Sequence, residues 1–131
     1  MSTQSNNRTH QNISWLPWDD ATFKMAQLRD KPVLLMITAE WCYWCHVMLE
    51  DTYLDPDVIA HINDNYVPVL VDNDRRPEIN FRYNVGGWPT TAILTPHGGI
   101  LAGATYLTPD QLLSMLSEVT DAYTQDKPGL Y

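Results

Sequence analysis

The amino-acid sequence predicts one α/β domain, with a central mixed sheet of about four to five strands and helices on both faces. Stretches with helical spacing of apolar residues alternate along the chain with short strand-like stretches. Two of the short stretches, 33–38 and 67–71, are continuously apolar, as in strands that helices cover on both faces of a sheet. The length of 131 residues fits one domain rather than two.

Composition and charge exclude several classes of protein. With 44% hydrophobic and 11% aromatic residues the chain can fill a core, which excludes wholesale disorder. The net charge of −8 repels phosphate backbones and anionic lipids, so we expect neither a nucleic acid nor a membrane as partner. The longest apolar run, 33–37, is far shorter than the ~20 residues of a membrane helix. The acidic surface also disfavours self-association, and we expect a monomer.

The two ends of the chain are expected to lie outside the folded domain. Residues 1–12 are polar and without periodicity, which predicts a flexible tail. They contain no apolar core of a secretory signal, so the expected location is the cytoplasm if Met1 is the native start. Residues 13–126 then form the domain, and residues 127–131 form its C-terminal end or a linker.

A helix is expected to open the domain. Asp19 and Asp20 are favourable N-cap residues for a helix that ends near Asp30, before Pro32. The residues expected on its apolar face are Phe23, Ala26 and either Ala21 or Leu28.

A strand, a helical region and a second strand follow. The run 33–38 is the first strand, and helical spacing begins at Tyr43. This spacing breaks around Pro56 and then resumes, which predicts either one kinked helix or two short ones. The run 67–71 is the second strand, in which Pro68 indicates an irregular or peripheral start.

Turn residues organise the second half of the domain. A short polar helix is expected at 77–83, and the Gly-Gly-Trp-Pro turn at 86–89 precedes a β-prone run at 90–94. The turn at 96–99 predicts a hairpin that leads into a strand at 100–106.

The last helix has the strongest signals. Thr108 is its cap and Pro109 its first residue. Its apolar residues at helical spacing are Leu112, Leu116, Val119 and Tyr123. The order of all these elements predicts βαβ units with a parallel sheet, to which the hairpin adds an antiparallel strand.

Both cysteines lie in one motif, Trp-Cys-Tyr-Trp-Cys-His at 41–46, between the first strand and a helix. A thiolate at a helix N-terminus faces free N–H groups and the positive end of the helix dipole, which predicts a lowered pKa for Cys42. The spacing places Cys45 within reach, so one thiol can attack a disulfide and the other can resolve the mixed disulfide. Protonated His46 would add a positive charge nearby. This pattern favours a redox-active dithiol.

The chain resembles the thioredoxin superfamily at the segments 39–42 (AEWC) and 87–90 (GWPT), which are similar to the active-site entry and the cis-proline loop of that superfamily. It is also similar to the N-terminal thioredoxin-like domain of the spermatogenesis-associated family. The motifs that carry this similarity are WLPW at 15–18, CYWCHVM at 42–48, VDNDRRPEI at 71–79 and GGWP at 86–89. The resemblance covers about residues 13–120.

This resemblance implies a thioredoxin-like fold and a thiol-disulfide oxidoreductase that acts on protein disulfides or thiols. Cys42 would be the attacking thiol, Cys45 the resolving thiol and Pro89 the cis-proline beside them. A further electron donor or acceptor is implied, and no cofactor. The aromatic residues expected to form an apolar collar for the substrate, or else an edge of the core, are Trp41, Tyr43, Trp44 and Trp88. His46 either tunes the thiolate or faces solvent.

Two departures from thioredoxin concern the same site. Met36 occupies the position, six residues before the first cysteine, where thioredoxin has a buried aspartate that handles the proton of the resolving thiol. Tyr43 and Trp44 replace the Gly-Pro pair between the cysteines. Both substitutions leave the direction of electron flow open.

Other functions stay open at this point. The fold could be a redox-silent binding module, or the N-terminal domain of a larger protein, with an inert cysteine pair. Cys-x-x-Cys-His is also the attachment motif of c-type haem. A closed zinc site needs four ligands, and we expect no metal. The acids Asp72, Asp74 and Glu78 lack the glycine and final glutamate of a calcium loop.

Overall fold

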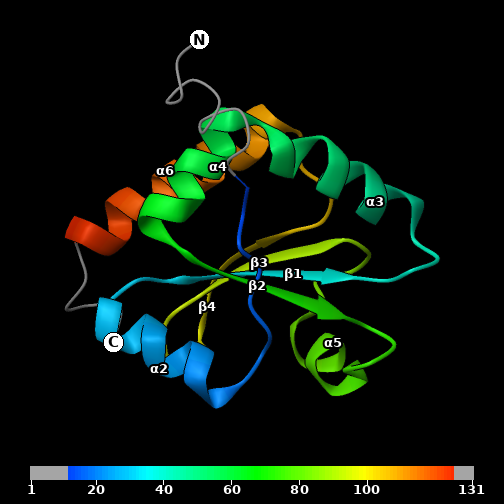
Figure 1. The fold of residues 1–131 in the computed structure, drawn as a ribbon, viewed down its shortest axis with the longest axis horizontal. Helices are drawn as coiled ribbons and strands as arrows, with labels where there is room; N and C mark the ends of the chain where they lie inside the picture. Colours follow the sequence, from blue (N-terminus) through cyan, green and yellow to red (C-terminus); the bar gives the residue numbers. More distant parts are fainter. Residues whose placement is uncertain (1–11, 126–131) are drawn as a thin grey trace, which may run out of the picture.

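The structure is a computed structural model that describes residues 12–125 (Figure 1). Residues 1–11 of the expected tail and the whole expected linker, 127–131, lie outside the described residues. Within the described chain, a four-stranded sheet has the order β2-β1-β3-β4. The strands are β1 (Val33–Thr38), β2 (Val67–Asp72), β3 (Thr90–Leu94) and β4 (Ile100–Ala104).

Helices cover both faces of the sheet, which confirms the predicted fold class (Figure 1). One face carries α3 (Tyr43–Glu50), α4 (Pro56–Asn65) and α6 (Pro109–Gln125). The other face carries α2 (Asp20–Arg29) and α5 (Pro77–Tyr83).

The direction of β3 corrects one expectation about the sheet. β1 and β2 are parallel, but β3 runs antiparallel to β1 as well as to β4, so the hairpin strand is not the only antiparallel one. The reason lies in α5. Its seven residues span about 10 Å, whereas a six-residue strand spans about 20 Å. The helix alone does not span the length of β2, and α5 lies beside the end of β2, so β3 starts there and runs antiparallel to β1 (Figure 1).

The packing face of α2 also differs from the expectation. Asp19 caps the helix as predicted, because its carboxylate accepts a hydrogen bond from the Thr22 N–H at 2.8 Å. The buried residues are Thr22 and Ala26, whereas Leu28 is 87% exposed. The ring of Phe23 packs edge to face against that of Trp18, with ring centroids 4.6 Å apart, and this contact helps to set the rotation of the helix. The predicted stripe through Ala21 or Leu28 is therefore wrong.

The predicted helical region from Tyr43 consists of two helices, α3 and α4. A 3-10 turn, Thr52–Leu54, separates them. The Asp55 carboxylate starts α4 by accepting hydrogen bonds from the N–H groups of Asp57 and Val58. Pro56 is the first residue of α4, so the break in the periodicity is a new N-terminus rather than a kink.

Strand β2 lies at one edge of the sheet, as Pro68 indicated. Leu16 bridges to this strand. Its N–H donates to the Pro68 carbonyl at 2.9 Å, and its carbonyl accepts from the Leu70 N–H at 3.1 Å. The backbone of residue 68 thus faces the outer edge, where the missing N–H of proline removes no bond to β1.

The sheet separates two apolar cores. On the face of α3, α4 and α6, Leu34 and Met36 of β1 pack with both cysteines. On the face of α2 and α5, Val33, Leu35 and Ile37 pack with β2 and β3. The alternation along β1 therefore directs its even-numbered residues toward the helix that carries the cysteines.

Candidate active site

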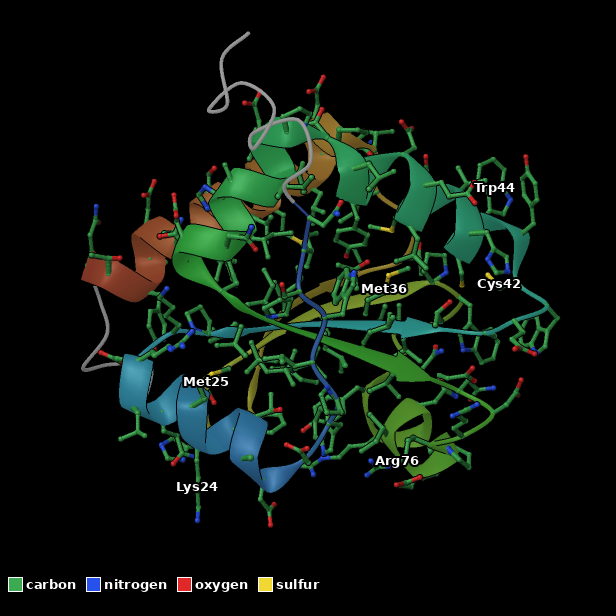
Figure 2. All side chains as sticks on the ribbon, in the orientation of Figure 1. Lys24, Met25, Met36, Cys42, Trp44 and Arg76 are labelled. Atoms are coloured by element: carbon green, nitrogen blue, oxygen red, sulfur yellow. The ribbon has the colours of Figure 1, made fainter. Side chains whose placement is uncertain are left out.

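The cysteine pair lies at the junction between the end of β1 and the start of α3, as Figure 2 shows for Cys42. Cys42 is the N-cap of α3 and has an extended backbone. Its N–H donates to the Ala39 carbonyl at 3.0 Å. Its Sγ accepts a hydrogen bond from the Cys45 N–H at 3.2 Å. The sulfur of Cys42 thus occupies the position at which a helix start stabilises negative charge.

The two thiols differ in their surroundings. Both cysteines are free, and Cys42 is 6% exposed whereas Cys45 is fully buried. Burial, reinforced by a hydrogen bond with Cys42, raises the pKa of Cys45 to about 11. Hydrogen bonding with the Thr38 hydroxyl and with the Ala39 backbone lowers the pKa of Cys45, against the larger effect of burial. Cys45 therefore stays a thiol near pH 7.

Met36 lies under this site without taking part in proton chemistry. It is fully buried and lies on the face of the sheet that carries α3, as Figure 2 shows. None of the groups that shift the pKa of Cys45 is a carboxylate. The position at which thioredoxin has its aspartate is therefore filled by an apolar side chain that packs in the core.

His46 is exposed on the first turn of α3. Its Nε2–H donates to the main-chain carbonyl of Glu40 at 2.8 Å. The imidazole thereby ties the helix to the loop that leads into Cys42.

Exposed aromatic residues surround the motif in sequence and in space. Trp41, Tyr43 and Trp44 are 61%, 69% and 54% exposed. The ring of Trp41 meets that of Trp88 edge to face at 5.2 Å, and Trp44 meets Tyr106 in the same way at 5.2 Å. These two pairs bring the segment 41–44 together with two later loops.

A pocket of about 240 Å³ lies between these rings. We call it the aromatic pocket, and its lining residues are Trp44, Trp88, Thr105 and Tyr106. The sequence identified Trp44 and Trp88 but missed the other two. Tyr106 closes the predicted last strand in the sequence, and only the fold brings it beside α3.

The loop that carries Trp88 is held by a network around Asn84. The Asn84 side chain accepts hydrogen bonds from the N–H groups of Gly86 and Gly87 at 2.7 and 2.9 Å. Gly86 has a φ of +124°, a conformation that side-chain-bearing residues rarely adopt. The indole N–H of Trp88 donates to Asn80 at 3.0 Å. The peptide bond between Trp88 and Pro89 is cis.

Among residues 12–125, no three His, Cys, Asp or Glu side chains gather in a way that could hold a metal ion. No described helix is long and apolar enough to cross a membrane.

The fold, together with a Cys-x-x-Cys motif at the start of α3, defines this chain as a member of the thioredoxin superfamily. The model of one family matches residues 2–130, almost the whole chain. The chain belongs to this family, Thioredox_DsbH, which is described as "Protein of unknown function, DUF255".

Relatives with similar sequences support the same assignment. Spermatogenesis-associated protein 20 of Rattus norvegicus is 30% identical over 135 residues, which cover 92% of this chain and 17% of the relative. Thiol:disulfide interchange protein DsbD 2 of Pseudomonas aeruginosa is 30% identical over 82 residues, 60% of this chain and 14% of the relative. The chain thus spans less than a fifth of the length of these relatives.

Solved structures show the same fold. A structure titled "DsbH Oxidoreductase" superposes with a TM-score of 0.72 at 21% identity, covering 87% of this chain and 86% of the other. A thioredoxin from Thermus thermophilus gives a TM-score of 0.74 at 24% identity, with 85% and 89% covered. These similarities establish the thioredoxin-like fold.

Proposed function

We propose that this chain is a thiol-disulfide oxidoreductase that acts on protein thiols or disulfides through Cys42 and Cys45. The observation that carries the proposal is the placement of the Cys42 sulfur at the N-cap of α3, bonded to the Cys45 N–H at 3.2 Å. A thiolate formed there is stabilised by the helix start. The name of the Pseudomonas aeruginosa relative, a thiol:disulfide interchange protein, supports the same chemistry.

The reaction proceeds in two exchanges. The Cys42 thiolate attacks one sulfur of a substrate disulfide, which forms a mixed disulfide and releases a substrate thiolate that takes up a proton. Cys45 then loses its proton and attacks the Cys42 sulfur. This step breaks the mixed disulfide, releases the second substrate thiolate and leaves a Cys42–Cys45 disulfide. Two electrons pass to the substrate, and the reverse sequence oxidises a dithiol.

The exposed rings next to Cys42 provide the surface for a protein substrate. Trp44, Trp88 and Tyr106 line the aromatic pocket beside the motif. Trp41 and Tyr43 extend the apolar surface on either side of Cys42. Large exposed rings bind extended peptide segments at a small entropic cost. In this proposal, Pro89 and Trp88 shape the wall of the groove, and His46 positions the loop before Cys42.

A redox-silent binding module is the second candidate. It is favoured by the buried Met36 and by the burial of Cys45, whose pKa of about 11 opposes the resolving step. In that case the aromatic pocket would hold a partner, or another part of a longer protein, and the cysteines would stay reduced.

The equilibrium between dithiol and disulfide distinguishes the two candidates. The protein is equilibrated in glutathione and dithiothreitol buffers, the thiols are alkylated, and the two forms are counted by mass. A two-electron transition between about −120 and −300 mV supports the oxidoreductase, and its position gives the direction of electron flow. C42S and C45S serve as controls that cannot form the internal disulfide.

Turnover provides the second half of the test. The wild type should reduce insulin disulfides with dithiothreitol as electron source, and C42S should not. A wild type that forms no internal disulfide and leaves insulin unreduced would establish the binding module instead.

A further inference from the structure

The resolving step requires Cys45 to lose a proton from a fully buried position. Met36, the β1 residue at the position where thioredoxin has its aspartate, can accept none. A group that reaches both the thiol and solvent is therefore needed, and the fold provides a candidate two residues further along β1.

Thr38 is the last residue of β1 and is partly exposed. Side chains alternate along a strand, so Thr38 projects to the same face as Leu34 and Met36, the face that packs against Cys45. Its hydroxyl interacts with the Cys45 thiol and lowers the pKa of that thiol against the larger effect of burial. A hydroxyl both donates and accepts, so it can pass a proton on.

Thr38 also lines a second pocket, of about 420 Å³, at the carboxyl ends of β1 and β2. We call it the polar pocket, and its lining includes Trp18, Thr38, Leu70, Asp72, Arg75 and Arg76. Its volume is large enough for several water molecules. Thr38 is thus the described residue that both interacts with the Cys45 thiol and borders this pocket.

Asp72 lies beside Thr38 in the sheet. The two residues are register partners of the parallel pair of β1 and β2, which places their side chains on the same face about 5 Å apart. The Asp72 carboxylate accepts a hydrogen bond from the Asp74 N–H at 2.8 Å, which fixes it at the mouth of the pocket. Of the residues that line this pocket, Asp72 alone carries a carboxylate.

We propose that Thr38 and Asp72 form the proton route of Cys45, with the Thr38 hydroxyl as the link and the Asp72 carboxylate, through water of the polar pocket, as the acceptor. The inference rests on the proposed oxidoreductase function, because it concerns the resolving step. Thr38 acts directly on the reacting thiol of Cys45, whereas Asp72 acts through Thr38 and pocket water, and neither residue is placed against the substrate.

The proton balance of the step is as follows. Thr38 accepts the thiol proton of Cys45 while it gives its own hydroxyl proton to pocket water, and Asp72 takes the proton from that water. The Cys45 thiolate attacks the Cys42 sulfur, and the substrate thiolate leaves. In the reverse direction the same groups return the proton.

Among the described residues, two arginines and Cys42 are the other charged or titratable groups beside the route. Arg76 is already engaged, because it pairs with Glu78 at 2.7 Å and donates to the Trp18 carbonyl at 3.1 Å. Arg75 borders the pocket with a guanidinium, a group that donates hydrogen bonds and accepts no proton. On the side of α3, Cys42 is the titratable group that faces Cys45, and it is bound in the mixed disulfide during this step.

The test isolates the resolving step. The reduced protein is mixed with 5,5′-dithiobis(2-nitrobenzoate), and attack of Cys42 releases one thionitrobenzoate. Attack of Cys45 on the resulting mixed disulfide then releases the second. Stopped-flow absorbance resolves the two releases across a pH series from about 6 to 10.

The second release should slow by roughly ten- to a hundredfold in T38V and in D72N near neutral pH. The difference in the rate of the second release between these variants and the wild type should decrease as the pH rises, because hydroxide then removes the proton of Cys45 directly. T38S, which keeps the hydroxyl, should behave as the wild type. D74N is the matched control: it removes a charge in the same loop from a residue that does not line the polar pocket.

The outcomes separate the two proposals. If the first release or the second fails in the wild type, the oxidoreductase function and the proton route are both overturned. If the wild type gives both releases and either T38V or D72N matches its second rate, the proton route alone is overturned. It is also overturned if D74N slows the second release as much as D72N does.

Discussion

The imidazole of His46 and the main-chain carbonyl of Glu40 are joined by a hydrogen bond of 2.8 Å that spans the whole cysteine motif. The bond closes a loop of which Cys42 is part, so the position of its sulfur depends on a side chain one turn further along α3. His46 thus has a structural task in addition to any charge that it carries.

H46A should therefore loosen the segment before Cys42. One exposed hydrogen bond is worth about 0.5–1 kcal/mol of the free energy of unfolding. Urea denaturation should show a loss of this size, and hydrogen exchange should show faster exchange at the Cys42 amide. Substitution by Gln, which can still donate, should recover part of both effects. Equal exchange rates in H46A and the wild type would contradict this account.

Alkylation should distinguish the two cysteines. Cys45 is fully buried and has a pKa of about 11, so it reacts slowly with iodoacetamide near neutral pH. The reduced native protein should take up one label, at Cys42, before the second. In C42S the remaining thiol should resist labelling until a denaturant is added. Rapid labelling of native C42S would contradict the buried position of Cys45.

The aromatic pocket should act in substrate binding. Trp44 is 54% exposed, so W44A should change stability little. The loss of one aromatic contact costs about 0.5–1.5 kcal/mol, which corresponds to a rise in KM of about 2- to 13-fold for a protein disulfide. F81A is the control, because Phe81 is 92% exposed on α5, across the sheet. An equal rise in KM in both variants would argue against the pocket.

Removal of the hydroxyl should change the free energy of unfolding differently at two buried tyrosines. The Tyr53 hydroxyl is buried and makes no hydrogen bond of standard geometry among the described residues, with the Thr91 hydroxyl as its polar neighbour. The Tyr66 hydroxyl donates to the Leu116 carbonyl at 2.7 Å. Y53F should leave the free energy of unfolding unchanged or raise it, whereas Y66F should lower it by about 1–2 kcal/mol. Thermal unfolding of both variants against the wild type measures this difference, and an equal loss in both would contradict it.

Stability should fall at alkaline pH. Burial raises the pKa of Cys45 to about 11 and that of Tyr66 to about 12, above their ordinary values of 9.0 and 10.0. The unfolded chain therefore releases these protons at lower pH than the folded protein does. The stabilisation is complete below about pH 9 and is lost as the pH rises toward 11 and 12. Urea midpoints at pH 8 and pH 10.5 should show the decrease, and C45A should show a smaller one.

Much of the fold could be predicted because its signals are local. The continuously apolar run at 33–38 and the β-prone run at 90–94 coincide with β1 and β3 as the structure has them. Thr108 and Pro109 fixed the start of α6 in the same way, since caps and prolines act on neighbouring main-chain groups.

The errors concern relations that no short segment carries. The antiparallel direction of β3 follows from the position of α5 beside the end of β2. The face that α2 buries follows from the contact of Phe23 with Trp18. The cysteines could be identified as site residues from the motif at 41–46 by itself. Tyr106 and Thr38 could not be found in this way, because their link to the site depends on tertiary packing and on strand register.

The bridge between Leu16 and β2 has a consequence for self-association. It occupies the carbonyl of residue 68 and the N–H of residue 70, which would otherwise face outward from an edge strand. An edge with open main-chain groups is a template for intermolecular strand addition, the step that begins amyloid-like aggregation. Within the described residues, the short segment before α2 thus covers part of the outer edge of β2, whereas β4 forms the other edge of the sheet.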